Sequence, residues 1–544
     1  MPLDPEQHKR YSVEETKKAL AAFQIGNLDT ARTIARDAID RGLETAFLLK
    51  IEGLWLQKNG QLQEALRAFH HARTLDHRDP MILQSIASVL FDMEEASSAL
   101  KIIDEALKIG PDLLSCHYLR GRILEAIYEY KSALFSYERA EKISPNNASV
   151  LAGISSVSFA LGEMERAEIT CKRALAINSD EPTANIVLAR IELENNLTID
   201  AETRLRWLLS QNISQKINAL CYSFLGDVLD YKKNTNDAFQ AYTLSNKLQS
   251  EMRIDLKNKA EKNIEGLKQL EGIINSYSSL SEIKEGCRIN QINHVFLLGF
   301  MRSGTTLLEQ ILISHPDVIS LEERNILEGC ADRFISSASG FQALENLSDS
   351  EANELREEYW KVVSETKNIP IKGTFIDKNP LNTVMLPVIR RVFPDAKIIF
   401  MIRDPRDVIL SCYRRPLTLN TFTYNFLNLE TAAILYDLIM KIGIKSIEKG
   451  KMQPLLIKYE DLLDDMKGTL LDICKFIHID YSDVFLKFAG NISGRNIASL
   501  SAIQIRKGIN RDSIEYWMAY NQQIKNVVGT LSPWISRWGY KQSY

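Results

Sequence analysis

A loop of glycine, hydroxyl and basic residues follows a short apolar run in the second half of the 544-residue chain. The apolar run is His294–Leu298, the loop is Gly299–Thr306, and the helical sequence LLEQILISH comes next. Backbone N–H groups of such a loop, together with the positive end of the following helix, can surround an anion. The loop residues that we expect to contact the anion are Arg302, Ser303, Gly304, Thr305 and Thr306.

Two further basic residues stand where short apolar runs end. Lys378 follows the run Thr374–Asp377, and Arg403 follows the run Lys397–Ile402. Ser411 comes eight residues after Arg403, a distance of about two helical turns with the intervening loop. One face of a helix and the loop before it could therefore present Arg403 and Ser411 to a single anion.

The first loop differs at one position from the nucleotide-binding pattern G-x-x-x-x-G-K-[ST]. Thr305 occupies the lysine position, and the cation of this loop, Arg302, precedes the second glycine. Because the lysine of that pattern reaches the β and γ phosphates, its replacement disfavours phosphate transfer from a Mg²⁺-bound nucleotide. A kinase of the P-loop class stays as an alternative, which ATP turnover in the presence of Mg²⁺ would test.

These residues need a scaffold in which the ends of several strands lie side by side. Apolar runs and helical patterns alternate in this half, which predicts a parallel sheet covered by helices on both faces. Ligands of such sheets bind at the carboxyl ends of the strands, where the loops above would gather. The four expected strands are His294–Leu298, Thr374–Asp377, Lys397–Ile402 and Pro454–Ile457.

The first half of the chain follows a different pattern, a repeat of 34 residues. Alanine recurs at this interval in two series that are seven residues apart, so both series lie on one face of a helix. A third series of small residues comes twelve residues before the first and marks where a partner helix crosses. The series are Ala31, Ala65, Ala99, Ala133, Ala167 and Ala201; Ala38, Ala72, Ala106, Ala140 and Ala174; and Gly53, Ala87, Gly121 and Ser155.

Prolines such as Pro80 and Pro145 separate one repeat from the next, because proline cannot continue a helix. The pattern resembles the tetratricopeptide repeat from Ser12 to Ser250. This resemblance implies an all-α superhelix whose concave face holds a peptide or another protein. The alternative is that the repeats only stabilise or dimerise the chain. Beyond them, Leu244–Leu270 is expected to form one capping helix that leads into a linker.

The second half resembles sulfotransferases in two motifs that contain the residues introduced above. The sequence Arg-Ser-Gly-Thr-Thr, which starts at Arg302, resembles the 5'-phosphosulfate loop of that family. The segment Phe400–Ser411 resembles its 3'-phosphate motif, in which Arg403 and Ser411 match the two phosphate-binding residues in type and spacing. The resemblance therefore implies that the anion is 3'-phosphoadenosine 5'-phosphosulfate, a co-substrate that is used without a metal.

The similarity to sulfotransferases spans nearly all of Asn293–Tyr540. The run Tyr459–Leu462 resembles a structural landmark of the family, and Gln504–Asn510 resembles the segment that covers the nucleotide. In that segment the resemblance assigns contacts with the 3'-phosphate to Arg506, Lys507 and Gly508.

Taken with the repeats, the whole chain is similar to bacterial repeat-containing sulfotransferases related to protein-tyrosine sulfotransferases. The expected fold is multidomain, with a tetratricopeptide-repeat domain at 1–265 and a helical linker at 266–290. An α/β, P-loop-like sulfotransferase domain with a parallel sheet is expected at 291–544.

The resemblance also implies the catalytic roles. Protein-tyrosine sulfotransferases have a catalytic glutamate at the position of Glu323, counted from the Arg-Ser-Gly-Thr-Thr loop. Because Glu322 stands where relatives carry a small residue, it stays an alternative base. Lys378 matches the lysine that neutralises the leaving phosphate oxygen. Arg302 is expected to hold the phosphosulfate, and Ser501 resembles a serine near the bridging oxygen.

The acceptor implied by the resemblance is a tyrosine in a protein or peptide, which the repeats would hold. Sugars, lipids and small phenols stay as alternatives, because the same base and lysine could sulfate any hydroxyl group. A repeat scaffold with an inactive transferase domain is a further alternative, and it predicts no sulfate transfer from any donor.

Bulk composition limits the other function classes. The chain is 45% hydrophobic and 25% charged with a net charge of −4, which argues against a nucleic-acid binder. Its N-terminal sequence has no signal-peptide pattern, and no apolar run reaches the length of a membrane span. Its seven cysteines form no CxxC motif, which disfavours a structural zinc site or a disulfide framework. We therefore expect a cytoplasmic protein.

Overall fold

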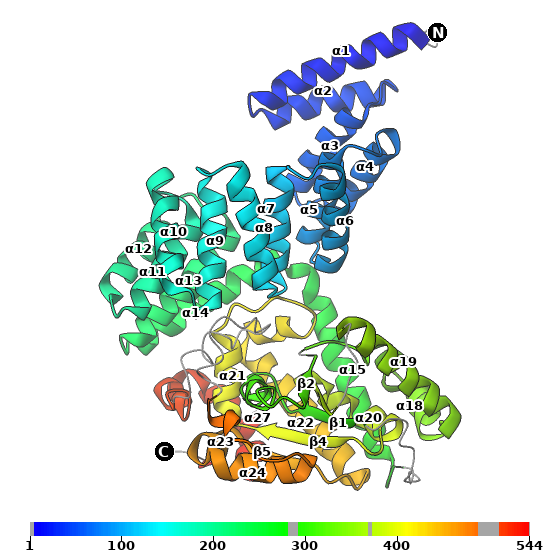
Figure 1. Cartoon of the computed structure of the whole chain (residues 1–544), viewed down its shortest axis with the longest axis vertical. Helices are drawn as coiled ribbons and strands as arrows, with labels where there is room; N and C mark the ends of the chain where they lie inside the picture. The colour runs from blue at the N-terminus through cyan, green and yellow to red at the C-terminus, as the bar shows by residue number, and fades with distance from the viewer. Residues whose placement is uncertain (1–4, 281–291, 322, 368–372, 488–510, 543–544) are drawn as a thin grey trace. The chain divides into compact units, whose positions relative to one another are not determined.

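The computed structural model describes residues 5–280, 292–321, 323–367, 373–487 and 511–542 (Figure 1). The chain divides into two compact units, Met1–Leu188 and Ala189–Tyr544, and each contains hydrophobic core clusters of its own. The division falls within one helix, so the domain boundary expected at residue 265 stays a prediction.

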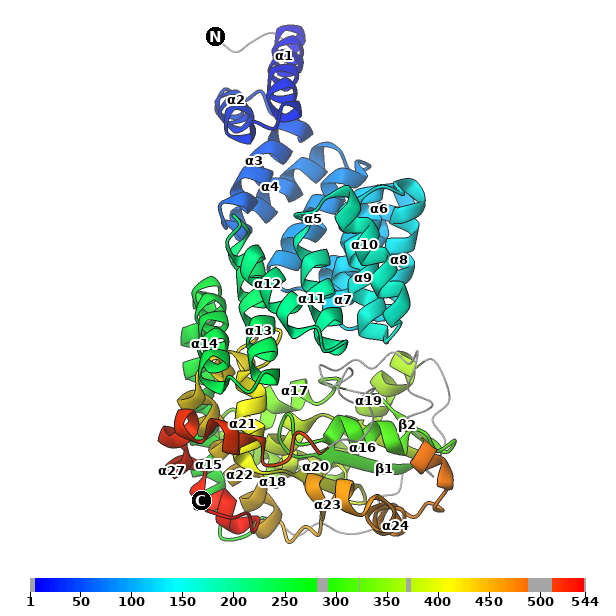
Figure 2. The same ribbon diagram turned by 90° about the vertical axis from the view of Figure 1, so that its left-hand side faces the viewer.

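The first unit consists of paired antiparallel helices joined by short turns (Figure 2). Asp79 and Pro80 show how the sequence sets a helix start. The Asp79 carboxylate accepts a hydrogen bond from the backbone N–H of Met81 at 2.8 Å, and Pro80 occupies the first turn. The helices are α1 (Pro5–Gln24), α2 (Leu28–Asp40), α3 (Ala46–Lys58), α4 (Leu62–Leu75), α5 (Pro80–Asp92), α6 (Ala96–Ile109), α7 (Leu114–Ala126), α8 (Tyr130–Ile143), α9 (Ala148–Leu161), α10 (Met164–Ile177) and α11 (Pro182–Glu194), the last of which spans the division between the units.

The predicted series of small residues is confirmed as the contact between paired helices. Every alanine of the two series in this unit is 0% exposed. Close approach is strictest at the glycines, because an added Cβ at Gly53 would lie 2.5 Å from the Phe69 ring. At Gly121 it would lie 2.6 Å from the ring of Tyr137. An aromatic ring from one helix thus packs on the bare backbone of its partner, as the 34-residue pattern requires.

The second unit begins with more helices of the repeat pattern and continues into the sheet. Its helices up to the linker are α12 (Thr198–Leu209), α13 (Gln215–Tyr231), α14 (Thr235–Met252), the 3₁₀ helix η1 (Ile254–Leu256) and α15 (Lys257–Ser276). The expected single helix Leu244–Leu270 is therefore wrong. Arg253 leaves the helical region at φ −119° and ψ 39°, and its guanidinium bonds Asp255 at 3.0 Å, so the chain breaks between α14 and α15.

Five parallel strands form one sheet in the order β2-β3-β1-β4-β5. The four strands expected from sequence are confirmed to within one residue at either end. The additional edge strand was not predicted, because three residues are too short to establish an alternating pattern. The strands are β1 (Asn293–Leu298), β2 (Val318–Ser320), β3 (Thr374–Lys378), β4 (Lys397–Ile402) and β5 (Leu455–Lys458).

Helices cover both faces of this sheet. Val295 and Leu297 of β1 point into a core formed with helices α16 (Thr305–Leu312) and α24 (Met466–Ile477). The alternate residue Phe296 points to the opposite face, where its ring lies 5.5 Å from that of Phe393. The remaining elements are α16 (Thr305–Leu312), α17 (Glu328–Cys330), the π-helix η2 (Ala331–Ile335), α18 (Ala338–Glu345), α19 (Asp349–Lys367), η3 (Pro380–Met385), α20 (Leu386–Val392), α21 (Pro405–Tyr413), η4 (Thr423–Leu427), α22 (Leu429–Lys449), α23 (Tyr459–Asp464), α24 (Met466–Ile477), η5 (Asp483–Lys487), η6 (Tyr516–Tyr520) and α27 (Asn521–Arg537).

The helical pair α13–α14 packs directly on helix α21, which follows strand β4. The guanidinium of Arg414, at the end of α21, lies 2.8 Å from the Asp230 carboxylate of α13. Arg415 pairs with Asp227 at 3.0 Å, and the Asn246 amide of α14 donates to the backbone oxygen of Tyr413 at 3.0 Å. In this unit, helices that follow the repeat pattern therefore contact a helix of the α/β part through ion pairs and a hydrogen bond.

Candidate active site

Three parallel strands deliver predicted site residues to one edge of the sheet, and a fourth strand brings Tyr459 to the same edge. The loop that contains Arg302 follows β1, Lys378 ends β3, Arg403 follows β4 and Tyr459 follows β5. Because the strands are parallel, their carboxyl ends lie together. Lys378, Arg403 and the loop after β1 thus meet at the centre of the sheet.

The backbone of the loop after β1 enters the left-handed region at two residues. Arg302 has φ 65° and Gly304 has φ 93°, both in the left-handed region that non-glycine residues seldom adopt. An added Cβ at Gly304 would lie 2.4 Å from the ring of Tyr459, so only glycine fits there. Ser303 and Thr305 are buried at 2% and 3% exposure. Helix α16 begins at Thr305 and points its N-terminus at this loop.

Arg302, Arg403 and Ser411 converge on one point beside this loop. Arg302 Nε donates to Ser411 Oγ at 3.0 Å, and Arg403 Nη1 donates to the backbone oxygen of Arg302 at 3.0 Å. Burial lowers the pKa of Arg302 to about 10, and the nearby Arg415 and Arg403 act in the same direction. In the part of the chain that the structure describes, the buried Nε of Arg403 has no hydrogen-bond partner. Two neighbouring guanidinium groups, with one N–H donor that has no partner among the described residues, are suited to binding an anion.

A second cluster forms around Lys378. Its Nζ lies 2.7 Å from Glu323 Oε1 and 3.4 Å from Glu309 Oε2. The side chains of Lys378 and Glu309 are each 1% exposed, whereas that of Glu323 is 41% exposed. Burial alone would lower the pKa of Lys378, but the two carboxylates outweigh it and raise that pKa above its ordinary value. The lysine is therefore an ammonium group held between an inner and an outer carboxylate.

The two clusters lie at the carboxyl ends of neighbouring strands, because β1 pairs with both β3 and β4. The structure thus brings together Arg302, Ser411, Arg403, Lys378 and Glu323. Glu322 and four further predicted site residues lie outside the described residues, so their roles stay predictions. Those four are Ser501, Arg506, Lys507 and Gly508.

Two residues of the site were missed by sequence reasoning as contributors to its chemistry. The ring of Tyr459 lies under the Arg403 guanidinium, 4.7 Å from its carbon, and against the loop glycine. By sequence, its run resembles only a structural landmark of the family. Glu309 had appeared as one polar residue in a helical pattern, and only a carboxylate amid the buried face of LLEQIL could have drawn attention to it.

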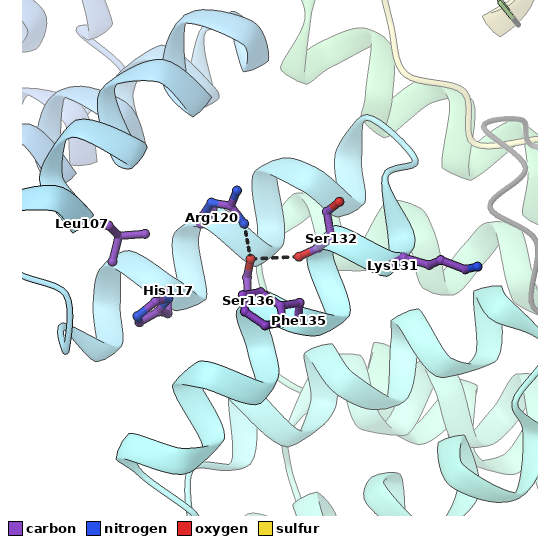
Figure 3. A pocket seen from close by; sticks show the side chains of 7 residues that line it. All are labelled: Leu107, His117, Arg120, Lys131, Ser132, Phe135 and Ser136. Carbon is purple, nitrogen blue, oxygen red and sulfur yellow. Dashed lines mark hydrogen bonds between the residues drawn. The ribbon is translucent and has the colours of Figure 1, made fainter. Parts of the chain in front are cut away.

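A separate hollow of about 460 Å³ opens in the first unit between helices α6, α7 and α8. Figure 3 shows that three of its lining residues are linked: Arg120 donates to Ser136 at 2.7 Å, and Ser136 donates to the backbone oxygen of Ser132 at 2.9 Å. None of the predicted site residues lines it. The lining residues are Leu107, His117, Arg120, Lys131, Ser132, Phe135 and Ser136.

Within the described residues, no helix is long and apolar enough to cross a membrane. No group of three His, Cys, Asp or Glu side chains in the same residues is arranged to hold a metal ion.

Several known proteins are similar in sequence to this chain. An uncharacterized protein of Aquifex aeolicus is 24% identical over 544 residues, covering 94% of this chain and 68% of its own. A putative protein-tyrosine sulfotransferase of Caenorhabditis briggsae is 25% identical over 256 residues, covering 46% of this chain and 89% of its own. Protein-tyrosine sulfotransferase 2 of Gallus gallus is 25% identical over 257 residues, covering 45% of this chain and 69% of its own.

Among solved structures, a tetratricopeptide repeat protein from Parabacteroides merdae matches 44% of this chain and 93% of its own, with a TM-score of 0.36 and 16% identity. Residues 294–483 match the model of the sulfotransferase family. They include the loop after β1, the Lys378 cluster and the Arg403 motif. The region of this chain that is similar to the sulfotransferase family therefore coincides with the parallel sheet and with the site at the carboxyl ends of its strands.

Proposed function

We propose that the protein transfers a sulfuryl group from 3'-phosphoadenosine 5'-phosphosulfate to the hydroxyl group of a tyrosine in a protein or peptide. The observation that carries this proposal is the Glu323–Lys378 pair, whose charged atoms lie 2.7 Å apart beside the anion-binding loop. A carboxylate and an ammonium so placed are the base and the cation that sulfuryl transfer to a hydroxyl group requires.

The chain's cationic residues fit this co-substrate at both of its charged ends. Arg403 and Ser411 would hold the 3'-phosphate, and Arg302 would hold the phosphosulfate with the amides of Ser303–Thr306. The buried Nε of Arg403, unpartnered among the described residues, supports an additional anionic partner there. The nucleotide, when bound, supplies the activated sulfuryl group.

Each of the two charged residues has a separate task. Glu323 accepts the proton of the acceptor hydroxyl as the oxygen attacks the sulfur, and its 41% exposed side chain is accessible to an acceptor from solvent. Lys378 stabilises the negative charge that develops on the leaving phosphate oxygen. Because the transition state of such a transfer is loose, positioning and charge stabilisation account for most of the catalysis.

The relatives named as protein-tyrosine sulfotransferases support tyrosine as the acceptor. The helical repeats would hold the acceptor polypeptide, as repeat arrays commonly do. We assign the repeats to 1–265, a linker to 266–290 and the transferase domain to 291–544. The cysteines Cys116, Cys171, Cys221, Cys330, Cys412 and Cys474 are free thiols, which supports a reducing compartment such as the cytoplasm.

A transfer assay tests this function directly. The full-length protein is incubated with the radiolabelled sulfate donor and a cell extract, and hydrolysed products are separated. Label recovered as tyrosine sulfate is the expected result. Label in a sugar or lipid would overturn the acceptor but not the transfer. Absence of labelling from any acceptor would favour an inactive scaffold, and ATP turnover with Mg²⁺ would favour the kinase alternative.

Replacing Arg403 with alanine is expected to weaken the binding of 3',5'-phosphoadenosine by about 2 kcal/mol, roughly thirty-fold, because a charged hydrogen-bonded contact is lost. Isothermal titration calorimetry measures this change. Arg391→Ala is the matched control, since Arg391 is also nearly buried and pairs with a carboxylate, that of Asp349 at 3.1 Å, on another helix. If the wild type and Arg403→Ala bound 3',5'-phosphoadenosine with equal affinity, the assignment of Arg403 to the 3'-phosphate would be wrong.

A further inference from the structure

The inner carboxylate of the Lys378 cluster has no role in the function proposed so far. Glu309 lies on helix α16, directly after the anion-binding loop, and its side chain is 1% exposed. No acceptor from solvent could reach it, so it cannot replace Glu323 as the base. A carboxylate buried this deeply is costly unless a specific partner compensates it.

Two contacts hold Glu309 in place. The Ser320 hydroxyl, at the end of strand β2, donates a hydrogen bond to Glu309 Oε1, and Lys378 Nζ lies 3.4 Å from Oε2. Burial raises the pKa of Glu309, and the ammonium of Lys378 opposes this rise. The carboxylate is therefore fixed by three elements that surround it: helix α16, strand β2 and strand β3.

The charge count around Lys378 explains why two carboxylates are needed. When Glu323 accepts a proton from the acceptor, it becomes neutral and no longer balances the ammonium. Lys378 is 0% exposed, so apart from the leaving phosphate oxygen that it stabilises, it would then be a buried cation with no carboxylate beside it unless Glu309 were present. Glu309 remains beside it throughout, because it is buried and anchored by Ser320.

The hydrogen-bond donors of Lys378 also indicate a separate role for the Glu309 carboxylate. An ammonium group has three N–H donors. In the described part of the chain, two of them face Glu309 and Glu323. The third is thus available for the phosphate oxygen that leaves, provided that the ammonium keeps its orientation. The inner carboxylate determines that orientation.

We propose that Glu309 is a positioning residue, a permanent counter-ion that keeps Lys378 charged and oriented while Glu323 moves between Lys378 and the acceptor hydroxyl. This inference rests on the proposed sulfotransferase function and deepens it. It assigns the two carboxylates around one lysine to different tasks according to their exposure.

The test compares full-length wild type with Glu309→Gln in transfer from the sulfate donor to a tyrosine peptide. Turnover is measured between about pH 7 and pH 9, below the ordinary titration range of the acceptor phenol near pH 10. The wild type is expected to keep its kcat throughout this range. Removal of one anion lowers the pKa of Lys378, so the variant should lose its ammonium, and with it kcat, as the pH rises. The alkaline limb is expected to move down by at least about one pH unit.

At neutral pH we expect kcat of Glu309→Gln to fall about ten-fold to a hundred-fold, with the Kd for 3',5'-phosphoadenosine changed less than about two-fold. Glu309→Asp keeps the charge and is expected to restore the wild-type alkaline limb. Glu345→Gln is the matched control: Glu345 is 8% exposed, pairs with Arg390 at 3.1 Å, and lies on α18 away from the site residues. This variant should lower the Tm without moving the pH profile.

The outcomes separate the two proposals. An active wild type with an unchanged pH profile in Glu309→Gln would overturn the inference alone, as would a profile that Glu345→Gln shifts equally. A wild type without any transfer would overturn the proposed function and the inference together.

Discussion

Replacing Lys378 with alanine is expected to lower kcat by roughly 10²–10³-fold, the loss typical when a preorganised electrostatic stabiliser is removed. The side chain of Lys378 is 1% exposed and its ammonium is held by two carboxylates, so the charge acts in a buried site where it is weakly screened. No neighbouring cation is placed to replace it at the end of β3 among the described residues, because Arg302 and Arg403 belong to the loops after β1 and β4.

The measurement is single-turnover transfer at saturating sulfate donor, together with calorimetric binding of 3',5'-phosphoadenosine. The affinity should stay within about three-fold of the wild type, because Arg302, Arg403 and Ser411 are unchanged. Lys445→Ala is the control, since it also removes a lysine that pairs with a glutamate, Glu271 at 2.6 Å, but lies on α22. Turnover of Lys378→Ala close to that of Lys445→Ala would remove Lys378 from the mechanism.

Replacing Glu323 with glutamine should lower kcat by about 10²–10⁴-fold, because the amide cannot accept the acceptor proton. The amide oxygen can still receive the hydrogen bond that Lys378 Nζ now donates to Glu323 Oε1 at 2.7 Å. Stability and nucleotide binding should therefore change little. The loss should appear in the chemical step rather than in the KM of the donor.

Glu322→Gln is the necessary comparison, because the sequence leaves Glu322 and Glu323 as alternative bases. We expect its kcat to stay within about three-fold of the wild type, because in our assignment Glu322 does not take the acceptor proton. A large loss in Glu322→Gln with near-normal turnover in Glu323→Gln would shift the assignment of the base by one residue.

The elements around the site could be predicted because each has a local pattern. Apolar runs of four to six residues between loops with glycine or proline indicated β1, β3, β4 and β5. The short edge strand β2 lacked such a pattern and exists through its pairing with β3. Similarly, the break between α14 and α15 was missed because apolar residues continue at helical spacing through Arg253, whose backbone and Asp255 contact interrupt the helix.

The residues of the site were predictable as members of motifs but not as neighbours. Arg403 and Ser411 are eight residues apart, so the resemblance to the 3'-phosphate motif, together with this spacing, predicted that one anion could contact both. The hydrogen bond from Arg302 to Ser411 spans 109 residues and depends on β1 and β4 being adjacent in the sheet. Likewise, the ring of Tyr459 reaches Arg403 only because β5 is adjacent to β4.

The amino-acid sequence by itself determined the 34-residue helical repeat, the alternation of strands and helices, and which loop we propose to bind the anion. These depend on interactions within a few turns or on backbone conformations that particular residues favour. Only the tertiary structure decided that Lys378 lies between a buried and an exposed carboxylate. Its partners come from separate elements, with Glu323 55 residues away in the chain, and packing of α16 on β1 and β3 sets which carboxylate is enclosed.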